Sequence, residues 1–147
     1  MSQLQPGSPQ PHRRLLGLDP GERRIGVAVS DELGMYAHPR PAIAAGPRAV
    51  AEIARLVEAE SITEVIVGLP LSLSGAESAQ TRSACAFAAS LRAHLSVPVT
   101  EWDERLSSVE AAREVRGSAR RSGELDSAAA GIVLQTVLDF RSGGVRR

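Results

Sequence analysis

Acidic residues stand where predicted strands end and where the last predicted helix begins. In the stretch LLGLDPGERRIGVAVSD, Asp19 follows an apolar run and directly precedes the Pro-Gly of a turn. Asp103 and Glu104 follow a predicted strand, and Asp126 lies in the first turn of the last predicted helix. Strand ends at one edge of an open α/β sheet lie close together, and ligands usually bind there. The spacing therefore predicts that carboxylates from distant parts of the chain gather at one site.

Gathered carboxylates favour a divalent cation as their common partner. Neighbouring negative charges repel one another, and burying a carboxylate without a cation is costly. Mg²⁺ and Mn²⁺ prefer oxygen ligands and keep open positions for phosphate and water. Two such ions about 4 Å apart can hold the attacking and leaving oxygens of a phosphodiester. The acids thus indicate a site for Mg²⁺ or Mn²⁺, with two ions expected, and phosphodiester hydrolysis as its chemistry.

Asp19 and Asp126 also have interpretations that involve no metal. Asp19 can cap its own turn through the backbone, as aspartate before Pro-Gly often does. Asp126 can be placed near a helix N-terminus because the helix macrodipole favours a negative charge there. From spacing alone, both interpretations stay open beside the metal site.

The acidic pair at the end of the fifth predicted strand is ambiguous. Asp103 and Glu104 can each form an ion pair with Arg105 or Arg116 instead of binding a metal. Successive strand residues face opposite sides of a sheet, so only one of the two is expected to face the metals. We favour Glu104 and keep Asp103 as the alternative.

Hydrophobic periodicity predicts an α/β domain that starts with a hairpin. A Pro-Gly turn separates the first two strands, and a third strand contains prolines that confine it to a sheet edge. Later strands alternate with helices, which gives a mixed sheet covered by helices. The predicted strands are 14–19, 24–30, 37–43, 64–70 and 97–102, and the predicted helices are 46–60, 75–95, 107–117 and 124–140.

Composition limits the class of protein. The 147 residues predict one domain over 14–141, with short tails over 1–13 and 142–147. No apolar run is long enough to span a bilayer, and the first residues lack the apolar core of a secretory signal. The single Cys85 excludes an internal disulfide and suits a reducing cytoplasm. Seventeen acids balance seventeen bases, so net charge alone does not indicate a nucleic-acid binder.

Four motifs resemble the YqgF/RuvX family of pre-16S ribosomal RNA nucleases, once called Holliday junction resolvase-like. They are LLGLDPGERRIGVAVSD, VIVGLPLSLSG, WDERLSSVEA and LDSAAAGIVLQTVLD, in that order over about residues 14 to 141. The resemblance implies a ribonuclease H-like fold with a five-stranded mixed sheet. It implies the strand order 3-2-1-4-5, with strand two antiparallel.

The resemblance also implies a function and its partners. The family's acids map onto Asp19, the Asp103–Glu104 pair and Asp126, which would hold Mg²⁺ or Mn²⁺. The implied task is to trim the 5′ end of pre-16S rRNA in the cytoplasm, with ribosome precursors as partners and a monomer or weak dimer as the assembly. Holliday junction resolution on structured DNA, which needs a dimer, is the first alternative. A non-catalytic RNA-binding or transcription-associated factor is the second.

Arginines near the acids are candidates for binding the nucleic-acid backbone. Arg24 and Arg105 flank the proposed centre and can hold phosphates, although a structural ion pair accounts for them equally well. The loop before the last predicted helix is also basic and can contact phosphates, with a solvated run of charges as the alternative. Its arginines are Arg116, Arg120 and Arg121.

Overall fold

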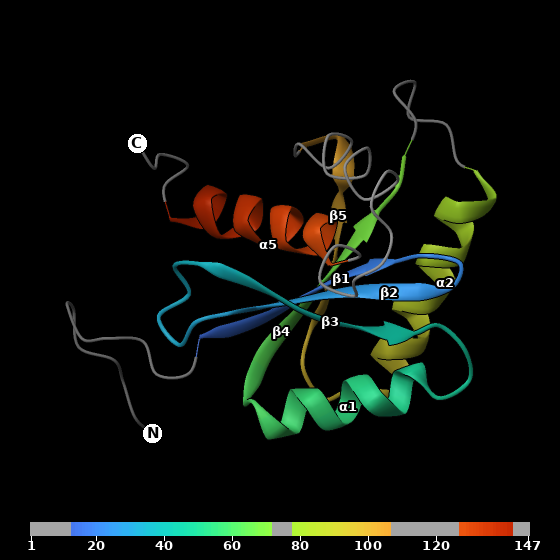
Figure 1. Ribbon diagram of the computed structural model, residues 1–147, viewed down its shortest axis with the longest axis horizontal. Coiled ribbons are helices and arrows are strands. Elements are labelled where there is room, and N and C mark those ends of the chain that lie inside the picture. Colours follow the sequence, from blue (N-terminus) through green and yellow to red (C-terminus); the bar gives the residue numbers. More distant parts are fainter. Residues whose placement is uncertain (1–12, 72–77, 107–126, 143–147) are drawn as a thin grey trace.

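The chain begins with three strands and continues with alternating helices and strands (Figure 1). The structure is a computed structural model that describes residues 13–71, 78–106 and 127–142. All five predicted strands are confirmed, and helices are present in the described parts of the ranges predicted over 46–60, 75–95 and 124–140. The helix predicted over 107–117 lies outside the described residues. The elements are β1 (Arg14–Pro20), β2 (Arg24–Ser30), β3 (Ala37–Ala44), α1 (Ala49–Ala59), β4 (Ile62–Leu69), α2 (Ala79–His94), β5 (Val99–Asp103), the 3₁₀ helix η1 (Glu104–Leu106) and α5 (Ala128–Arg141).

The five strands form one mixed sheet with β1 at its centre. The strand order is β3-β2-β1-β4-β5. β2 runs antiparallel to both β1 and β3, whereas β1, β4 and β5 run parallel. This topology confirms the predicted order 3-2-1-4-5 with an antiparallel second strand. β3 lies at one edge, where Pro39 and Pro41 are tolerated because an edge strand needs fewer N–H donors.

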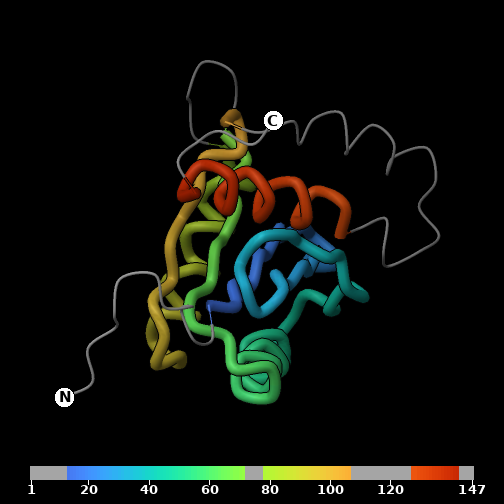
Figure 2. The backbone as a smooth tube through the Cα atoms, turned by 90° about the vertical axis from the view of Figure 1, so that its left-hand side faces the viewer, coloured from blue at the N-terminus to red at the C-terminus, as the bar shows by residue number. Residues whose placement is uncertain are grey.

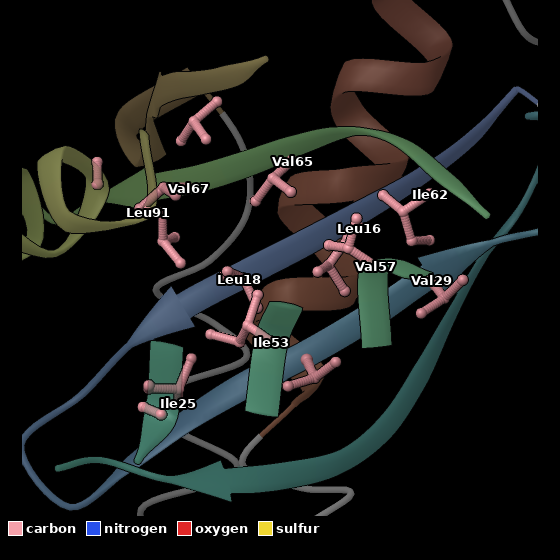
Figure 3. Packing of buried hydrophobic residues seen from close by; sticks show 14 residues of the cluster. Leu16, Leu18, Ile25, Val29, Ile53, Val57, Ile62, Val65, Val67 and Leu91 are labelled. Carbon is pink, nitrogen blue, oxygen red and sulfur yellow. The ribbon is translucent and has the colours of Figure 1, made fainter. Parts of the chain in front are cut away.

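Helices cover both faces of the sheet (Figures 1 and 2). α1 and α2 pack against one face, and α5 packs against the other. Alternate residues of each strand supply the two layers, because successive strand side chains point to opposite sides. Leu16 and Leu18 of β1 belong to the first layer, together with Ile53 of α1 and Leu91 of α2 (Figure 3). Leu15 belongs to the second layer, which α5 completes.

α5 approaches the central strand closely at Gly17. A Cβ atom at this position would lie 2.9 Å from the Cβ of Leu134 and 3.2 Å from the carbonyl oxygen of Ala130. Glycine therefore sets how near α5 can lie to the backbone of β1. Although much of α5 is buried, it has only 14 residues, and the described part of the chain contains no helix long and apolar enough to cross a bilayer.

Polar side chains attach the middle and the end of α5 to the sheet. Gln135 accepts a hydrogen bond from the N–H of Ala37 (2.9 Å) and donates one to the carbonyl of Met35 (3.0 Å). Arg141 in the last turn donates to both carboxylate oxygens of Glu64 on β4, at 2.6 and 3.0 Å. This ion pair lowers the pKa of the Glu64 carboxyl, chiefly through the hydrogen bond from Arg141. α5 is thus held against both halves of the sheet.

Ser127, which occupies the N-cap position of α5, bridges an irregularity between β2 and β3. Ile25 pairs with Ile43 and Val27 pairs with Arg40, so Gly26 of β2 lies opposite both Pro41 and Ala42 of β3 and a β-bulge results. The fully buried hydroxyl of Ser127 accepts a hydrogen bond from the N–H of Val27 (2.9 Å) and donates one to the carbonyl of Arg40 (2.6 Å). One side chain therefore fixes the point of the sheet at which α5 begins.

An ion cluster joins the end of α1 to the sheet. Both carboxylate oxygens of Glu60 accept hydrogen bonds from Arg40, at 2.6 and 2.8 Å, and Arg14 lies 3.2 Å from one of them. The hydrogen bonds from Arg40 are the largest cause of a lowered pKa for the Glu60 carboxyl. The cluster connects β1, β3 and α1 through charge-assisted bonds.

We expect Ser127→Ala to lower the free energy of unfolding by about 1–3 kcal/mol, because it leaves a buried N–H and a partly buried carbonyl without the hydroxyl that joins them. Urea denaturation followed by circular dichroism measures the change. Ser142→Ala is the matched control, since that hydroxyl is exposed and bonds only the carbonyl of Asp139 (3.0 Å). Equal losses in the two variants would contradict the role given to Ser127.

The lowered pKa of Glu60 predicts a dependence of stability on pH. Between the folded-state pKa and the unfolded value of about 4.3, the unfolded chain binds more protons, so stability rises with pH there. The contribution is complete above the unfolded value and is lost as pH falls through the folded-state pKa. We expect Glu60→Gln to flatten the acid limb of the stability curve by at most about 1 kcal/mol, because solvent screens the pair. Denaturation at a series of pH values measures it, and parallel acid limbs would refute the expectation.

Candidate active site at the carboxyl ends of the central strands

Asp19 lies near the carboxyl end of β1, on the face of the sheet that α5 covers. It follows Leu15 and Gly17 at alternate positions, and these two residues contact α5 or its layer. Asp19 pairs with Gly26 of β2, and only 2% of its surface is exposed. The apolar pattern of β1 thus continues directly into a buried carboxylate.

Glu104 lies on the same face, at the carboxyl end of β4. It begins η1, immediately after β5, and is 5% exposed. Its side chain extends over Gly68, where an added Cβ would lie 2.9 Å from Oε2, 3.2 Å from Cγ and 3.3 Å from Cδ of Glu104. Gly68 follows Ile66, which packs in the layer of α5, at the alternate position of β4. A side chain at position 68 would therefore point to the face of the sheet on which Asp19 lies.

Strand register puts these two carboxylates at the same level of the sheet. Leu18 of β1 pairs with Val67 of the parallel strand β4, and the next residues along the two strands are Asp19 and Gly68. Neighbouring strands are about 4.8 Å apart. Asp19 and the Glu104 carboxylate, which covers Gly68, thus occupy neighbouring positions on one face.

Asp103 is turned to a different partner. Its carboxylate accepts hydrogen bonds from Nε and Nη2 of Arg105 and from the backbone N–H of Arg105 (2.9 Å). The side-chain bond from Arg105 is the main cause of a lowered pKa for the Asp103 carboxyl. The ion pair that the sequence left open for Asp103 is therefore present. Of the two adjacent acids, Glu104 is the one beside Asp19.

The sequence did not reveal the parts played by Gly68 and Ser127. Gly68 belongs to the Gly-Leu-Pro motif at the end of β4, but nothing in that motif indicates which side chain will lie over it. Ser127 stands directly before a helix, as N-cap residues do, yet its bonds to β2 and β3 depend on a bulge that only the folded sheet shows.

The remaining predicted site residues are placed only in part. Arg24 is exposed and begins β2, so it lies at the same edge as the end of β1. Asp126 and the loop arginines Arg116, Arg120 and Arg121 lie outside the described residues. Within residues 13–71, 78–106 and 127–142, no set of three or more His, Cys, Asp or Glu side chains is arranged to hold a metal. Ser127, next to Asp126 in sequence, bonds Val27, the neighbour of the Gly26 that pairs with Asp19.

The donor chemistry at this edge fits a divalent cation. Two buried carboxylates on one face are hard oxygen ligands, which Mg²⁺ and Mn²⁺ prefer. Like charges held at neighbouring positions disfavour one another unless a cation is shared between them. Because Gly68 has no side chain, the space over it is open to the carboxylate of Glu104.

Comparison with known proteins finds one family over most of the chain. The model of the RuvX family, described as "Holliday junction resolvase", matches residues 13–140. A relative from Chloroflexus aurantiacus is 42% identical over 139 residues, which cover 90% of this chain and 91% of the relative. A relative from Thermobifida fusca is 45% identical over 136 residues, covering 84% of this chain and 86% of the relative. Both bear the name "Putative pre-16S rRNA nuclease".

Solved structures give the fold. T. thermophilus RuvC in complex with a Holliday junction substrate superposes with a TM-score of 0.56 at 19% sequence identity, covering 90% of this chain and 97% of RuvC. At that identity the likeness concerns architecture alone, and it confirms the predicted ribonuclease H-like fold.

Proposed function

Since the chain belongs to the RuvX family, we propose that it is a metal-dependent nuclease that processes the 5′ end of precursor 16S rRNA in the cytoplasm. The observation that carries the proposal is the pair of buried carboxylates, Asp19 and Glu104, on one face at the ends of neighbouring strands. The name that the relatives share supplies the substrate class. Ribosome precursors are accordingly the proposed partners.

Asp19, Glu104 and Asp126 are the proposed ligands of Mg²⁺ or Mn²⁺, with two ions at the site. Bound there, a divalent cation supplies a Lewis acid that stabilises the charge developing on the phosphate oxygens. The contribution of Asp19 and Glu104 is to hold carboxylate oxygens in fixed, water-poor positions before the substrate arrives. Such preorganisation is a large part of catalysis in buried sites.

The arginines at this edge have the proposed task of binding the nucleic-acid backbone. The Asp103 carboxylate holds Arg105 through Nε and Nη2, which fixes the direction of a guanidinium that carries five N–H donors. Arg24 begins β2 at the edge where Asp19 lies. Contacts to phosphate position a substrate without reading its sequence. Arg116, Arg120 and Arg121 are proposed to extend these contacts.

Holliday junction resolution is the second candidate, because the description of the matching family model names it. The same carboxylates serve both reactions. Resolution requires two sites about one duplex apart and hence a stable dimer, whereas the proposed rRNA processing suits a monomer or a weak dimer.

We expect Asp19→Asn and Glu104→Gln each to lower nuclease turnover by about 10²-fold or more, because each removes a charged ligand from the place where charge develops. Asp103→Asn is the matched control and should lose clearly less, since it gives up an ion pair with Arg105. Single-turnover cleavage with saturating Mn²⁺ measures the three rates. A clearly larger loss in Asp103→Asn than in Glu104→Gln would assign the ligand to Asp103 instead.

Matched substrates separate the candidate functions. We expect cleavage of a precursor rRNA fragment with Mg²⁺ or Mn²⁺, none with EDTA, and slower cleavage of a four-way DNA junction. Light scattering on the same samples gives the mass in solution. Symmetric cutting of the junction by a stable dimer would favour resolution. Tight RNA binding without metal-stimulated cleavage of either substrate would indicate a non-catalytic RNA-binding factor.

A further inference from the structure

We infer that Gly68 is a positioning residue: the missing side chain at this position determines where the Glu104 carboxylate lies relative to Asp19, and thereby the affinity of the site for a divalent cation. The cation part of this inference rests on the proposed function. The steric part rests on the described residues alone.

The neighbours of Gly68 point to Glu104 specifically. The three atoms nearest to an added Cβ are all in the Glu104 side chain, at 2.9, 3.2 and 3.3 Å. Real Cβ contacts essentially never fall below 3.0 Å, so the carboxylate would have to move. Gly17 and Gly131 differ, because their added Cβ atoms would first meet Leu134 and Pro39, which pack α5 onto the sheet.

The backbone at position 68 does not itself require glycine. Gly68 lies inside β4, pairs with Trp102 of β5, and is not among the described residues with a positive φ angle. An alanine can therefore take up this strand conformation. Its cost falls on the side chain that lies over it, which is Glu104.

Displacing Glu104 affects metal binding because cation sites tolerate little error in ligand position. Metal–ligand distances hold to within about 0.2 Å, and loss of a supporting contact around a ligand typically weakens binding about 10–100-fold. With Cβ present at position 68, the Glu104 carboxylate must move away from the backbone of β4 by a few tenths of an ångström, and its placement relative to Asp19 changes accordingly. The carboxylates of Asp19 and Glu104 are then both still present, but their relative position has changed.

The test is a double-mutant cycle on the full chain with Gly68→Ala, Glu104→Ala and both together. Mn²⁺ affinity is measured by isothermal titration calorimetry and thermal stability by calorimetry. We expect Gly68→Ala to raise the Kd for Mn²⁺ about 10-fold or more in the wild-type background and to leave it unchanged in the Glu104→Ala background. The Tm should likewise fall in the first background and not in the second.

Gly131→Ala is the matched control. Its added Cβ would lie 3.2 Å from Cγ of Pro39 on β3 and within 4 Å of no atom of Glu104, so it is expected to leave the Mn²⁺ affinity unchanged. If Gly68→Ala prevents folding but the double variant folds, Glu104 is the obstacle and the inference is supported. If neither Gly68→Ala nor the double variant folds, the obstacle lies elsewhere and the inference is overturned.

The outcomes distinguish this inference from the proposed function. Wild-type protein that binds no Mn²⁺ contradicts the proposed function, and the thermal cycle then decides the role of Gly68 alone. Wild-type protein that binds Mn²⁺ while Gly68→Ala binds equally well overturns the inference and leaves the proposed function standing. A Gly68→Ala effect that persists at full size in the Glu104→Ala background also overturns it.

Discussion

The burial of two carboxylates on one face of the sheet is the constraint that the rest of this structure must satisfy, because a carboxylate is costly to remove from water. Asp19 and Glu104 are both nearly buried and stand at neighbouring positions, so the backbone that carries them must be held firmly. β1, β4 and β5 are parallel, so their carboxyl ends lie side by side. Apolar layers on both faces of the sheet hold these strand ends in place.

Hydrogen bonds and one close backbone contact fix the position of α5 on the sheet. Apolar packing alone leaves a helix able to slide along a sheet, whereas directed hydrogen bonds define one position. Ser127, Gln135 and Arg141 provide such bonds at the start, middle and end of the helix, and Gly17 sets its distance from β1. Because α5 covers the face that carries Asp19, the bonds that position the helix also determine the shape of the candidate site.

The sequence was sufficient to predict five strands with Asp19 at the end of the first, because alternation and turn residues indicate them. The strand order came from the resemblance of four motifs to a known family. It favoured Glu104 over Asp103 without excluding either, because the chain leaves the strand at Asp103 and enters a 3₁₀ turn at Glu104. Strand alternation says nothing about such a turn. The space over Gly68 and the bulge bridged by Ser127 depend on contacts between distant segments, which no local pattern encodes.

The prolines of β3 have a consequence for aggregation of the protein. An open sheet offers its outer strands as templates on which other chains can add, which is a common route to fibrils. β3 carries Pro39 and Pro41 close together, and neither can donate an N–H to an incoming strand. Along this edge of the sheet, the two prolines thus oppose the addition of a strand from another copy of the chain.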